Sequence, residues 1–549
     1  MALKHFLAQP GKSHILCPAV DRLTDFTSYA EAQRHFSWEA LWALFDGDRE
    51  HLNIAHECVD RHVGRDLDGG VAIKVAHADG SDEFITFEEL AETSGRLAGD
   101  LRRRGLEPGQ RVAIMLEPSL AFYAALFGTM KAGGIAVPLF TLFGPDGLRL
   151  RIDDCRPSFL LLAPEKADLA AQATEAGCAV VIADAAYLEG LAAVPVLPVR
   201  QSAAADLAMY QYTSGTTRAL PEAVKHSHRA VVTVSIAALY GTGVRPGDRF
   251  MCPSSPAWGH GLWHGTIAPL ALGVGIAAYA GKFDAERLLR ALEDYRITNL
   301  SAAATHYRMI KNATGREGRG GGSGGLALQK LSFTGEPIDS DTAAWAEETF
   351  GVPVCSMYGT TEVGVILANY PGAADLAVKT GSLGKPVPGV EVAVLDHQGG
   401  VCATGQIGEI MVRRGGGWFP TKDLGHRDAE GYYYHDGRAD DAIISAGWTM
   451  SAVEIEDTLL KHGDIDECAA VAVPDETRGQ VAKAFVVSQR RGNDAFVREI
   501  QDFAKQRLSR HEYPRQVAFV AELPKTPAGK INRRALREAN AAAPPVREG

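Results

Sequence analysis

The sequence predicts an α/β protein with a large N-terminal domain of mostly parallel sheets and a small C-terminal domain of α+β type. Two observations predict this organisation. From about residue 70 onward, apolar runs of strand type alternate with amphipathic helical patterns. A charged stretch at Asp436–Asp441 then precedes a last piece that is long enough for a small domain of its own. We therefore expect domains at residues 1–437 and 438–549, with a hinge near Asp440.

Local signals predict the individual elements. A helix is expected at Phe87–Arg104, because Thr86 and Glu89 can form a capping box at its start and Gly105 can end it. Periodicity predicts a second helix at 120–131 and strands at 112–116, 135–139, 180–183 and 206–212. The last piece has helix and strand patterns at 455–461, 469–473, 484–487, 496–508 and 516–520.

Composition argues against several classes of protein. The chain has 549 residues, which predicts roughly two to four domains. A formal net charge of −11 argues against nucleic-acid binding and against contact with an anionic membrane. No apolar stretch reaches the ~20 residues of a membrane span, and the N-terminus lacks a secretory pattern. The eight cysteines are scattered singly, so we expect a cytoplasmic protein; the sequence leaves the oligomeric state open, a homodimer included.

Small hydroxyl residues and one glycine are concentrated at Tyr212–Thr217, directly after a strand-like run. Glycine permits unusual backbone angles, and hydroxyls with successive backbone N–H groups suit phosphate oxygens. A plain surface turn has the same composition. This stretch alone therefore leaves phosphate binding and a turn both open.

A second stretch, Tyr358–Gly364, follows the strand-like run 352–357. Thr360 and Thr361 stand beside Glu362 between two glycines. A hydroxyl beside a carboxylate suits a phosphate oxygen and Mg²⁺, because Mg²⁺ takes one or two carboxylates together with phosphate oxygens. The alternative is a β-turn with a solvated glutamate.

Asp423 and Arg438 form a third candidate pair. A carboxylate can accept both hydroxyls of a ribose, and an arginine offers planar, permanently charged donors. Taken singly, Asp423 also suits a turn, and Arg438 also suits a surface ion pair.

The fourth stretch is Pro524–Arg534, in which Pro527 and Gly529 preset a turn directly before Lys530. Such a turn can present one ammonium group at a fixed place. A basic surface loop is the alternative.

In this order the stretches resemble the adenylate-forming superfamily of acyl-CoA synthetases, peptide-synthetase adenylation domains and luciferases. The resemblance runs from about Glu83 to Arg534 and is carried by YTSGTT, Gly335–Pro337, YGTTEVG, the Asp423–Arg438 pair and PKTPAGK. The acetyl-CoA and medium-chain acyl-CoA synthetase branch is most similar, because LNIAHECVDRH, GSLGKPVPGVEV and VPDETRGQ all occur in this chain.

The resemblance implies a site for ATP and AMP. Its residues contact phosphates, base or ribose: Thr213, Ser214, Gly215, Thr216, Thr217, Gly335, Glu336, Pro337, Tyr358, Gly359, Thr360, Asp423 and Arg438. Within this set Tyr358 is expected to stack on the adenine, and Asp423 is expected to take the ribose hydroxyls.

The resemblance also implies the catalytic residues Lys530, Thr361 and Glu362. Glu362 is expected to bind Mg²⁺, and Lys530 is expected to bridge the acid and the α-phosphate. Gly447 is expected to line the channel for coenzyme A. Asp440 is expected to be the hinge about which a mobile lid domain turns between the two half-reactions.

Three positions depart from the family pattern. Glu222 stands where the phosphate loop usually has a lysine, so we expect Arg218 or Lys225 to supply the missing cation. Lys422 replaces the usual glycine of the ribose motif, and Thr449 replaces a common arginine.

The acyl pocket is expected to involve Trp258, Gly259, His260 and Gly359. Relatives that use acetate have a bulky tryptophan at the position of Gly359, so a glycine predicts room for a larger acid and Gly359→Trp is expected to favour short acids. Trp258 and Trp263 supply apolar area, whereas His260 and His264 can each make a hydrogen bond or simply pack. A medium-chain, branched or aromatic acid is therefore expected.

The predicted function is an AMP-forming acid–thiol ligase that uses ATP, Mg²⁺ and coenzyme A. One alternative is an enzyme that loads a separate carrier protein. A second is a nucleotide-binding protein that has lost catalysis through its altered phosphate loop; acid-dependent release of pyrophosphate distinguishes it from an enzyme.

Overall fold

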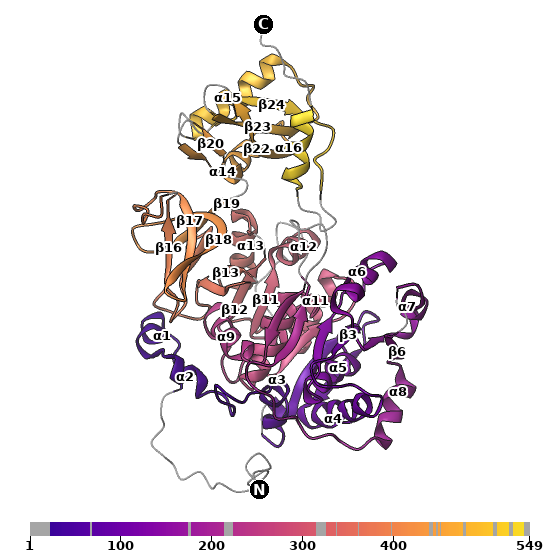
Figure 1. Cartoon of the computed structure of the whole chain (residues 1–549). Coiled ribbons are helices and arrows are strands. Elements are labelled where there is room, and N and C mark those ends of the chain that lie inside the picture. Colours follow the sequence, from indigo (N-terminus) through magenta and orange to yellow (C-terminus); the bar gives the residue numbers. More distant parts are fainter. Residues whose placement is uncertain are drawn as a thin grey trace.

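The computed structural model describes residues 22–65, 68–173, 177–212, 223–314, 325–335, 337–360, 362–396, 398–438, 443–445, 448–450, 452–475, 479–508, 513–525 and 531–542. These residues form a large N-terminal part and a small C-terminal part that stands above it (Figure 1). The predicted α/β class with a small second domain is confirmed.

A six-stranded sheet occupies one side of the large part. Its order is β6 (Ala179–Ile182), β5 (Phe159–Leu162), β3 (Arg111–Met115), β4 (Ile135–Pro138), β7 (Leu207–Gln211) and β8 (Val224–Ser227). Its pairs are parallel except β7–β8, which is antiparallel. The neighbouring helices are α4 (Phe87–Arg103), α5 (Leu120–Lys131), α6 (Pro145–Cys155), α7 (Ala167–Ala173) and α8 (Ala185–Gly190). Thr86 caps α4 as predicted, because its Oγ1 accepts from the Glu89 N–H at 3.0 Å.

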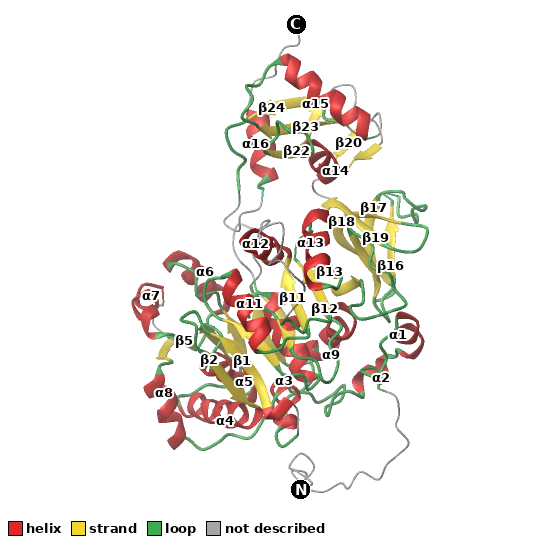
Figure 2. Ribbon diagram, turned by 180° about the vertical axis from the view of Figure 1, so that it is seen from behind, coloured by secondary structure: helices red, strands yellow, loops and turns green. Residues whose placement is uncertain are grey.

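A 13-stranded sheet forms the centre and the other side. Its order is β16 (Val392–Leu395), β17 (Gly408–Arg414), β18 (Gly417–Arg427), β19 (Tyr433–Arg438), β15 (Ser382–Pro386), β14 (Gly364–Ala368), β13 (Val354–Thr360), β12 (Lys330–Thr334), β11 (Asn299–Ala303), β9 (Phe250–Met251), β10 (Ile276–Tyr279), β1 (Val71–Ala76) and β2 (Asp82–Thr86). The pairs from β13 to β1 are parallel, whereas those from β16 to β13 are antiparallel. The antiparallel half, which helix–strand alternation did not predict, forms a lobe below the C-terminal part (Figure 2).

Helices fill the space around this sheet. They are α1 (Tyr29–His35), α2 (Trp38–Trp42), α3 (Ile54–Cys58), α9 (Ala230–Ile236), α10 (Ala268–Ala271), α11 (Ala285–Asp294), α12 (Ala304–Thr314) and α13 (Ser340–Phe350). Two π-helical turns, η5 (Ala237–Gly241) and η6 (His260–Ile267), continue α9 and precede α10. Short 3₁₀ turns are η1 (Asp60–His62), η2 (Asp68–Gly70), η3 (Pro164–Lys166) and η4 (Leu191–Ala193).

The C-terminal part has its own sheet and its own cores. Its elements are β20 (Ile443–Ser445), β21 (Trp448–Met450), α14 (Ala452–Leu459), β22 (Glu467–Asp475), β23 (Gly479–Val487), α15 (Asp494–Arg507), β24 (Gln516–Phe519) and α16 (Arg533–Ala542). Alternate residues of β22 enter different cores: Cys468 and Ala470 pack with α14 and α15, whereas Ala469 and Val471 pack with Leu523 and Leu536. Arg438 ends β19 of the large sheet, so the predicted boundary at 437/438 stays a prediction.

Candidate active site

Tyr358 and Asp423, 65 residues apart, meet where the large sheet curls. The Tyr358 hydroxyl donates to Asp423 Oδ2 at 2.6 Å, and His435 Nε2 lies 3.6 Å from Asp423 Oδ1. Asp423 is only 5 % exposed. A carboxylate has about four acceptor sites, and these neighbours fix its direction. The residues predicted for base and ribose therefore lie together.

The backbone at Lys422, directly before Asp423, shows why the family usually has glycine at this position. Lys422 has φ +64°, in the left-handed region that glycine adopts at little cost. The turn is held because the Lys422 N–H donates to Glu409 Oε1 at 3.1 Å and the Asp423 N–H donates to Thr421 Oγ1 at 3.2 Å. The backbone of Arg438 is the strand partner of Asp423 across β18 and β19, and the role of Arg438 stays a prediction.

The motif at 358–364 is a tight hairpin rather than a loop after a strand. Tyr358, Gly359 and Thr360 belong to β13, and Gly364 begins β14. Glu362 is exposed at the tip, where its Oε2 accepts from Thr360 Oγ1 at 2.7 Å. An exposed carboxylate is the kind of ligand that Mg²⁺ takes together with phosphate oxygens and waters, so Glu362 fits this ion.

Arg414, which the sequence reasoning missed, supports this hairpin. Its Nη1 donates to the Glu362 carbonyl at 2.7 Å and its Nη2 donates to the Val363 carbonyl at 3.1 Å. The only available signal is that Arg414 directly precedes the glycine run 415–417, which joins β17 to β18.

Gly359 is required by the close approach of two strands. A Cβ on Gly359 would lie 1.9 Å from the Gly364 carbonyl oxygen, where the β13–β14 register shifts. Gly359→Trp would therefore displace β14 before it altered any pocket. The expectation that this substitution reports pocket size is corrected, whereas the role of Gly359 in acid selection stays a prediction.

The predicted acyl wall contacts the predicted adenine residues. Gly335 has φ +92°, and a Cβ there would lie 3.0 Å from the Trp258 ring, so glycine permits this approach. Pro337 accepts a hydrogen bond from Arg308 at 3.4 Å. Trp258, predicted for the acyl pocket, thus packs against Gly335, predicted for the adenine pocket.

The wall continues along the π-helix η6. Both ring nitrogens of His260 are occupied, by Ser254 Oγ at 3.0 Å and Ser301 Oγ at 2.9 Å. Burial lowers the pKa of His260 well below its usual value, so the ring is neutral. His260 therefore has no free ring nitrogen for an acid in this arrangement, and its contribution is shape.

Gln211 connects this wall to the strand that leads into the predicted phosphate loop. Trp263 Nε1 donates to Gln211 Oε1 at 2.7 Å, and a Cβ on Gly259 would lie 2.6 Å from Gln211 Nε2. Gln211 ends β7 and pairs with Val224 of β8. Gln211, the last residue of β7, therefore lies beside the predicted acyl wall.

Several predicted residues lie outside the described residues. They are Thr213, Ser214, Gly215, Thr216, Thr217, Arg218, Glu222, Glu336, Thr361, Asp440, Gly447 and Lys530. Their roles stay predictions. Within the described ranges, no group of three or more His, Cys, Asp and Glu side chains could hold a metal ion. The same ranges contain no helix with the length and hydropathy of a bilayer span.

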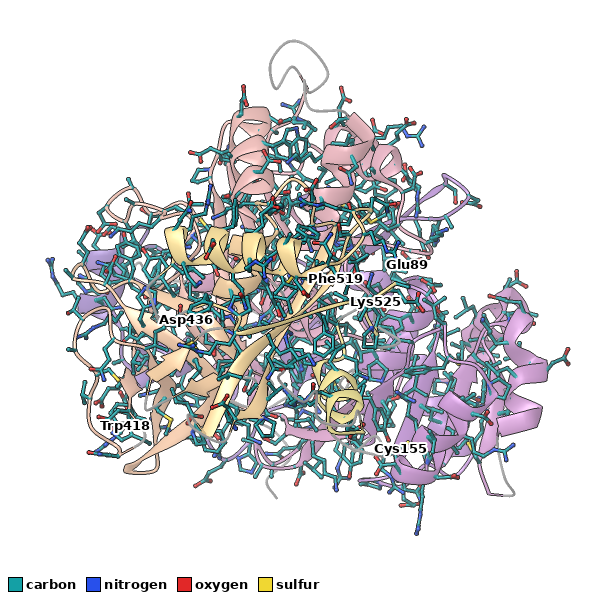
Figure 3. All side chains as sticks on the ribbon, turned by 90° about the horizontal axis from the view of Figure 1, so that it is seen from above. Glu89, Cys155, Trp418, Asp436, Phe519 and Lys525 are labelled. Carbon is teal, nitrogen blue, oxygen red and sulfur yellow. The ribbon has the colours of Figure 1, made fainter. Side chains whose placement is uncertain are left out.

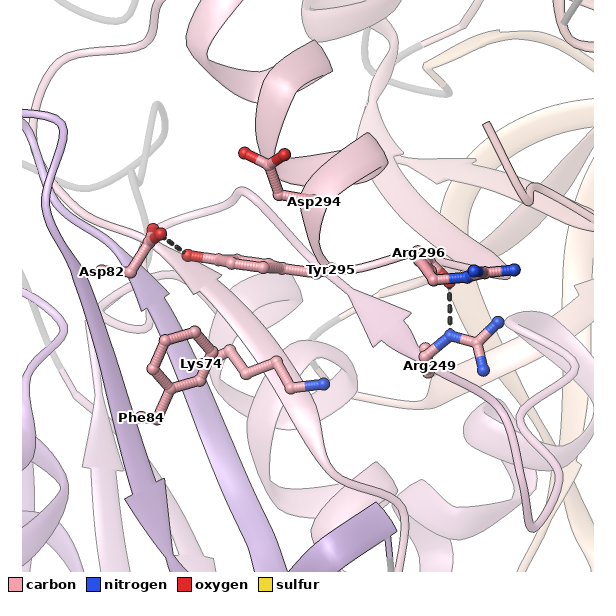
Figure 4. Close-up of a pocket in the computed structure, with 7 residues that line it drawn as sticks. All are labelled: Lys74, Asp82, Phe84, Arg249, Asp294, Tyr295 and Arg296. Atoms are coloured by element: carbon pink, nitrogen blue, oxygen red, sulfur yellow. Dashed lines mark hydrogen bonds between the residues drawn. The ribbon is translucent and has the colours of Figure 1, made fainter. Parts of the chain in front are cut away.

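A hollow of about 400 Å³ lies away from these residues (Figure 4). It is lined by Lys74, Asp82, Phe84, Arg249, Asp294, Tyr295 and Arg296. Two hydrogen bonds shape it: the Tyr295 hydroxyl donates to Asp82, and Arg249 Nε donates to the Arg296 carbonyl. None of its residues was predicted for the active site.

Comparison with known proteins supports the resemblance to the adenylate-forming superfamily. Residues 69–419 match the family described as AMP-binding enzyme, and residues 454–530 match its C-terminal domain. The acetyl-coenzyme A synthetase of Bacillus subtilis (strain 168) is 29 % identical, over 95 % of this chain and 96 % of the relative.

Two solved structures are similar over nearly their full length. The Brucella canis acyl-CoA synthetase has a TM-score of 0.71 and 30 % identity, over 94 % of this chain and 99 % of that one. An anthranilate CoA ligase in complex with anthranoyl-AMP has a TM-score of 0.75 and 25 % identity, over 91 % and 99 %. The predicted superfamily, and with it the prediction of an AMP-forming synthetase, is confirmed. The chain belongs to the AMP-binding enzyme family.

Proposed function

We propose that this protein is an ATP-dependent acid–CoA ligase that activates a medium-chain, branched or aromatic acid as an acyl-adenylate. The observation that carries the proposal is the hydrogen bond between Tyr358 and the buried Asp423. It joins the residues predicted for adenine and ribose at the base of the hairpin that bears Glu362.

In the first half-reaction a carboxylate oxygen of the acid attacks the α-phosphorus of ATP. The bond from that phosphorus to the bridging oxygen breaks, and pyrophosphate leaves. Two anions must approach, so fixed cations in a site that excludes water favour the step. Lys530 supplies one positive charge. When bound through Glu362, Mg²⁺ supplies further charge neutralisation at the phosphates.

In the second half-reaction the sulfur of coenzyme A attacks the acyl carbonyl, the bond to the AMP oxygen breaks, and AMP leaves. This step makes no use of an ammonium group at the phosphates. A small domain that turns about Asp440 and brings Gly447 to the site suits the exchange.

The acyl wall supports an apolar acid. Trp258 and Trp263 give apolar area, and the ring nitrogens of His260 are already paired with serines. The named ligands of the relatives include an aromatic acyl-AMP, which supports an aromatic acid among the substrates. Those relatives are named as CoA synthetases and ligases, which favours free coenzyme A over a carrier protein.

A panel of acids tests the proposal. Acetate, isobutyrate, octanoate and benzoate are each incubated with ATP and Mg²⁺, and pyrophosphate release and thioester formation are measured with coenzyme A or with a phosphopantetheinylated carrier protein. Release with octanoate, isobutyrate or benzoate above acetate, together with acyl-CoA, is the expected result. Thioester on the carrier protein alone would favour the loading enzyme, and no acid-dependent release would favour a nucleotide-binding protein without catalysis.

A further inference from the structure

An ion pair with a buried carboxylate joins two helices of the C-terminal part; the side chain of its arginine is 21 % exposed. Arg533, the first residue of α16, donates from Nη2 to Glu456 Oε2 at 2.5 Å and from Nε to Oε1 at 3.2 Å. Glu456 Oε1 also accepts from the Ala470 N–H of β22 at 2.7 Å. Glu456 is 6 % exposed. Three donors, two of them in the planar fork of one arginine, leave this carboxylate one orientation.

A second set of contacts closes the chain just before Arg533. Lys525 and Ile531 form an antiparallel bridge, and the Asn532 N–H donates to the Pro524 carbonyl at 2.7 Å. Lys525 Nζ lies 3.0 Å from Glu467 Oε1, again on β22. The described residues on the two sides of 526–530 are therefore close together, and Lys525 contacts the same strand, β22, whose Ala470 N–H donates to Glu456. Lys525 is labelled on the C-terminal part in Figure 3.

The stretch between these anchors carries the predicted catalytic amine. Residues 526–530 lie outside the described residues, but both of their ends are fixed by described contacts. Arg533 follows Lys530 by three residues. The helices α14 and α16 lie on the side of the C-terminal part nearer the large part, and α15 lies on the far side (Figure 1, Figure 2).

A stabilising role alone does not account for a pair of this kind. Burying the Glu456 carboxylate costs solvation, and replacing a buried ion pair by apolar side chains is often neutral or favourable. The domain already has two apolar cores, one on each face of β22. What a two-pronged arginine on a buried carboxylate supplies is a fixed geometry. The ion pair fixes the start of α16, and Lys530 precedes that start by three residues in the sequence.

We propose that Glu456 and Arg533 are positioning residues for the adenylation half-reaction, because their ion pair fixes the base of the stretch that presents Lys530. The proposal rests on the role of Lys530 in the proposed function. If the proposal holds, the Glu456–Arg533 ion pair is needed for the first half-reaction, in which Lys530 acts, and is not needed for the second.

The two half-reactions of the full-length enzyme test this. Glu456→Gln keeps an acceptor for the Ala470 N–H and removes the charge that holds Arg533. A displacement near 1 Å can cost about 10²-fold in rate, so kcat for acid-dependent pyrophosphate release should fall about 10- to 100-fold. KM for ATP should change little, and conversion of pre-made acyl-AMP to acyl-CoA should stay within about twofold of wild type, because that step does not need the amine.

Two further variants separate positioning from folding. Arg533→Lys keeps the charge but loses the fork, so its rate should lie between Arg533→Gln and wild type. Arg490→Gln removes another ion pair of the same domain, that of Arg490 with Asp464 and Glu499, and should leave both half-reactions unchanged. Thermal unfolding of each variant measures any loss of structure.

The outcomes are distinct. Selective loss of adenylation in Glu456→Gln, with partial activity in Arg533→Lys, supports the proposal. Equal loss of both half-reactions, or no loss in either, overturns it. A wild-type enzyme without acid-dependent pyrophosphate release overturns the proposed function first and this inference with it. An active wild type in which Lys530→Ala retains adenylation overturns the assigned role of Lys530 and hence the inference, while ligase activity itself stands.

Discussion

The two halves of the proposed site are built differently. In the large part, predicted residues contact one another directly: Tyr358 bonds Asp423, and Gly335 packs against Trp258. In the small part, described residues on both sides of the Lys530 stretch are held by charges: Arg533 by Glu456 of α14, and Lys525 by Glu467 of β22. Backbone register and the hydrogen bond of Tyr358 to the Asp423 carboxylate fix the first half, whereas ion pairs of Lys and Arg with Glu fix the base of the second.

This difference fits the proposed functions of the two halves, which are nucleotide binding in the large part and presentation of the Lys530 amine by the small part. A pocket that holds nucleotide through two half-reactions gains from rigid neighbours, because preorganised groups need no rearrangement during reaction. A cation that is needed in only one half-reaction has to be accurate there and removable afterwards. The small part should therefore tolerate changes to its surface but not to the pair that sets where its amine stands.

The largest effect should come from the amine itself. Lys530→Ala is expected to lower acid-dependent pyrophosphate release on the order of 10³-fold, because a positioned charge at the reacting phosphate is lost. Thioester formation from pre-made acyl-AMP should be spared. Single-turnover assays of each half-reaction measure this. A similar loss in both would remove the distinction between the halves.

Acid should act on the large part first. Burial lowers the pKa of His226, His228 and His264 to about 4, and that of His62 to about 3. These histidines are neutral when folded and bind protons when unfolded, near pH 6.5. The free energy of unfolding is therefore unaffected by these histidines above pH 6.5. It falls as pH drops from 6.5 toward 4, by about 1.4 kcal/mol per pH unit for each extra proton that the unfolded chain binds.

Hydrogen exchange resolved by peptide, between pH 7 and pH 5, checks where stability is lost. His228 is the sharpest probe, since its Nδ1 accepts from the Ile54 N–H at 3.1 Å and a protonated ring cannot. His228→Gln keeps an acceptor without a titrating group, so its unfolding should depend on pH with a slope smaller by about one proton. An unchanged slope would mean that His228 does not charge on unfolding.

Much of this arrangement could be predicted from sequence. The helix 120–131 was predicted to the residue, and the cap at Thr86 was correct, because periodicity and capping are local. Only the family resemblance implied that Tyr358 and Asp423 share one nucleotide site, because four successive strand pairings, β18–β19, β19–β15, β15–β14 and β14–β13, connect those positions. No local pattern carries that information.

Other features could not be predicted for specific reasons. The glycines at 359 and 364 indicate a turn after a strand, but the sequence does not show that the turn joins two paired strands, because the pairing partner is not known from a local pattern. Arg414 and Arg533 were missed because their contacts are carbonyls and a carboxylate far away in the sequence. The sequence alone does not show which arginine of a basic run makes a long-range contact, because that depends on the tertiary structure.

A moderate effect should come from Tyr358→Phe. The phenol loses its bond to the Asp423 carboxylate, while the ring stays available for the base. A hydrogen bond to a charged group is worth about 1.5–3 kcal/mol, part of which solvent replaces, so KM for ATP should rise about 5- to 10-fold with kcat less affected. A double-mutant cycle with Asp423→Asn should be non-additive. Additive effects would mean that the two residues act independently and that this half is not preorganised through their contact.

The smallest effect concerns the backbone next to the same carboxylate. Lys422 is held at φ +64°, which costs a side-chain-bearing residue roughly 1–2 kcal/mol relative to glycine. Lys422→Gly should therefore raise the free energy of unfolding by about 1 kcal/mol after the greater backbone entropy of glycine is allowed for. Lys422→Ala is the matched control, because it removes the same exposed side chain and keeps the strained angle; it should give no gain in thermal melts. Equal stabilisation by both substitutions would place the cost in the lysine side chain and not in the backbone. The φ angle of residue 422 would then store little strain beside Asp423.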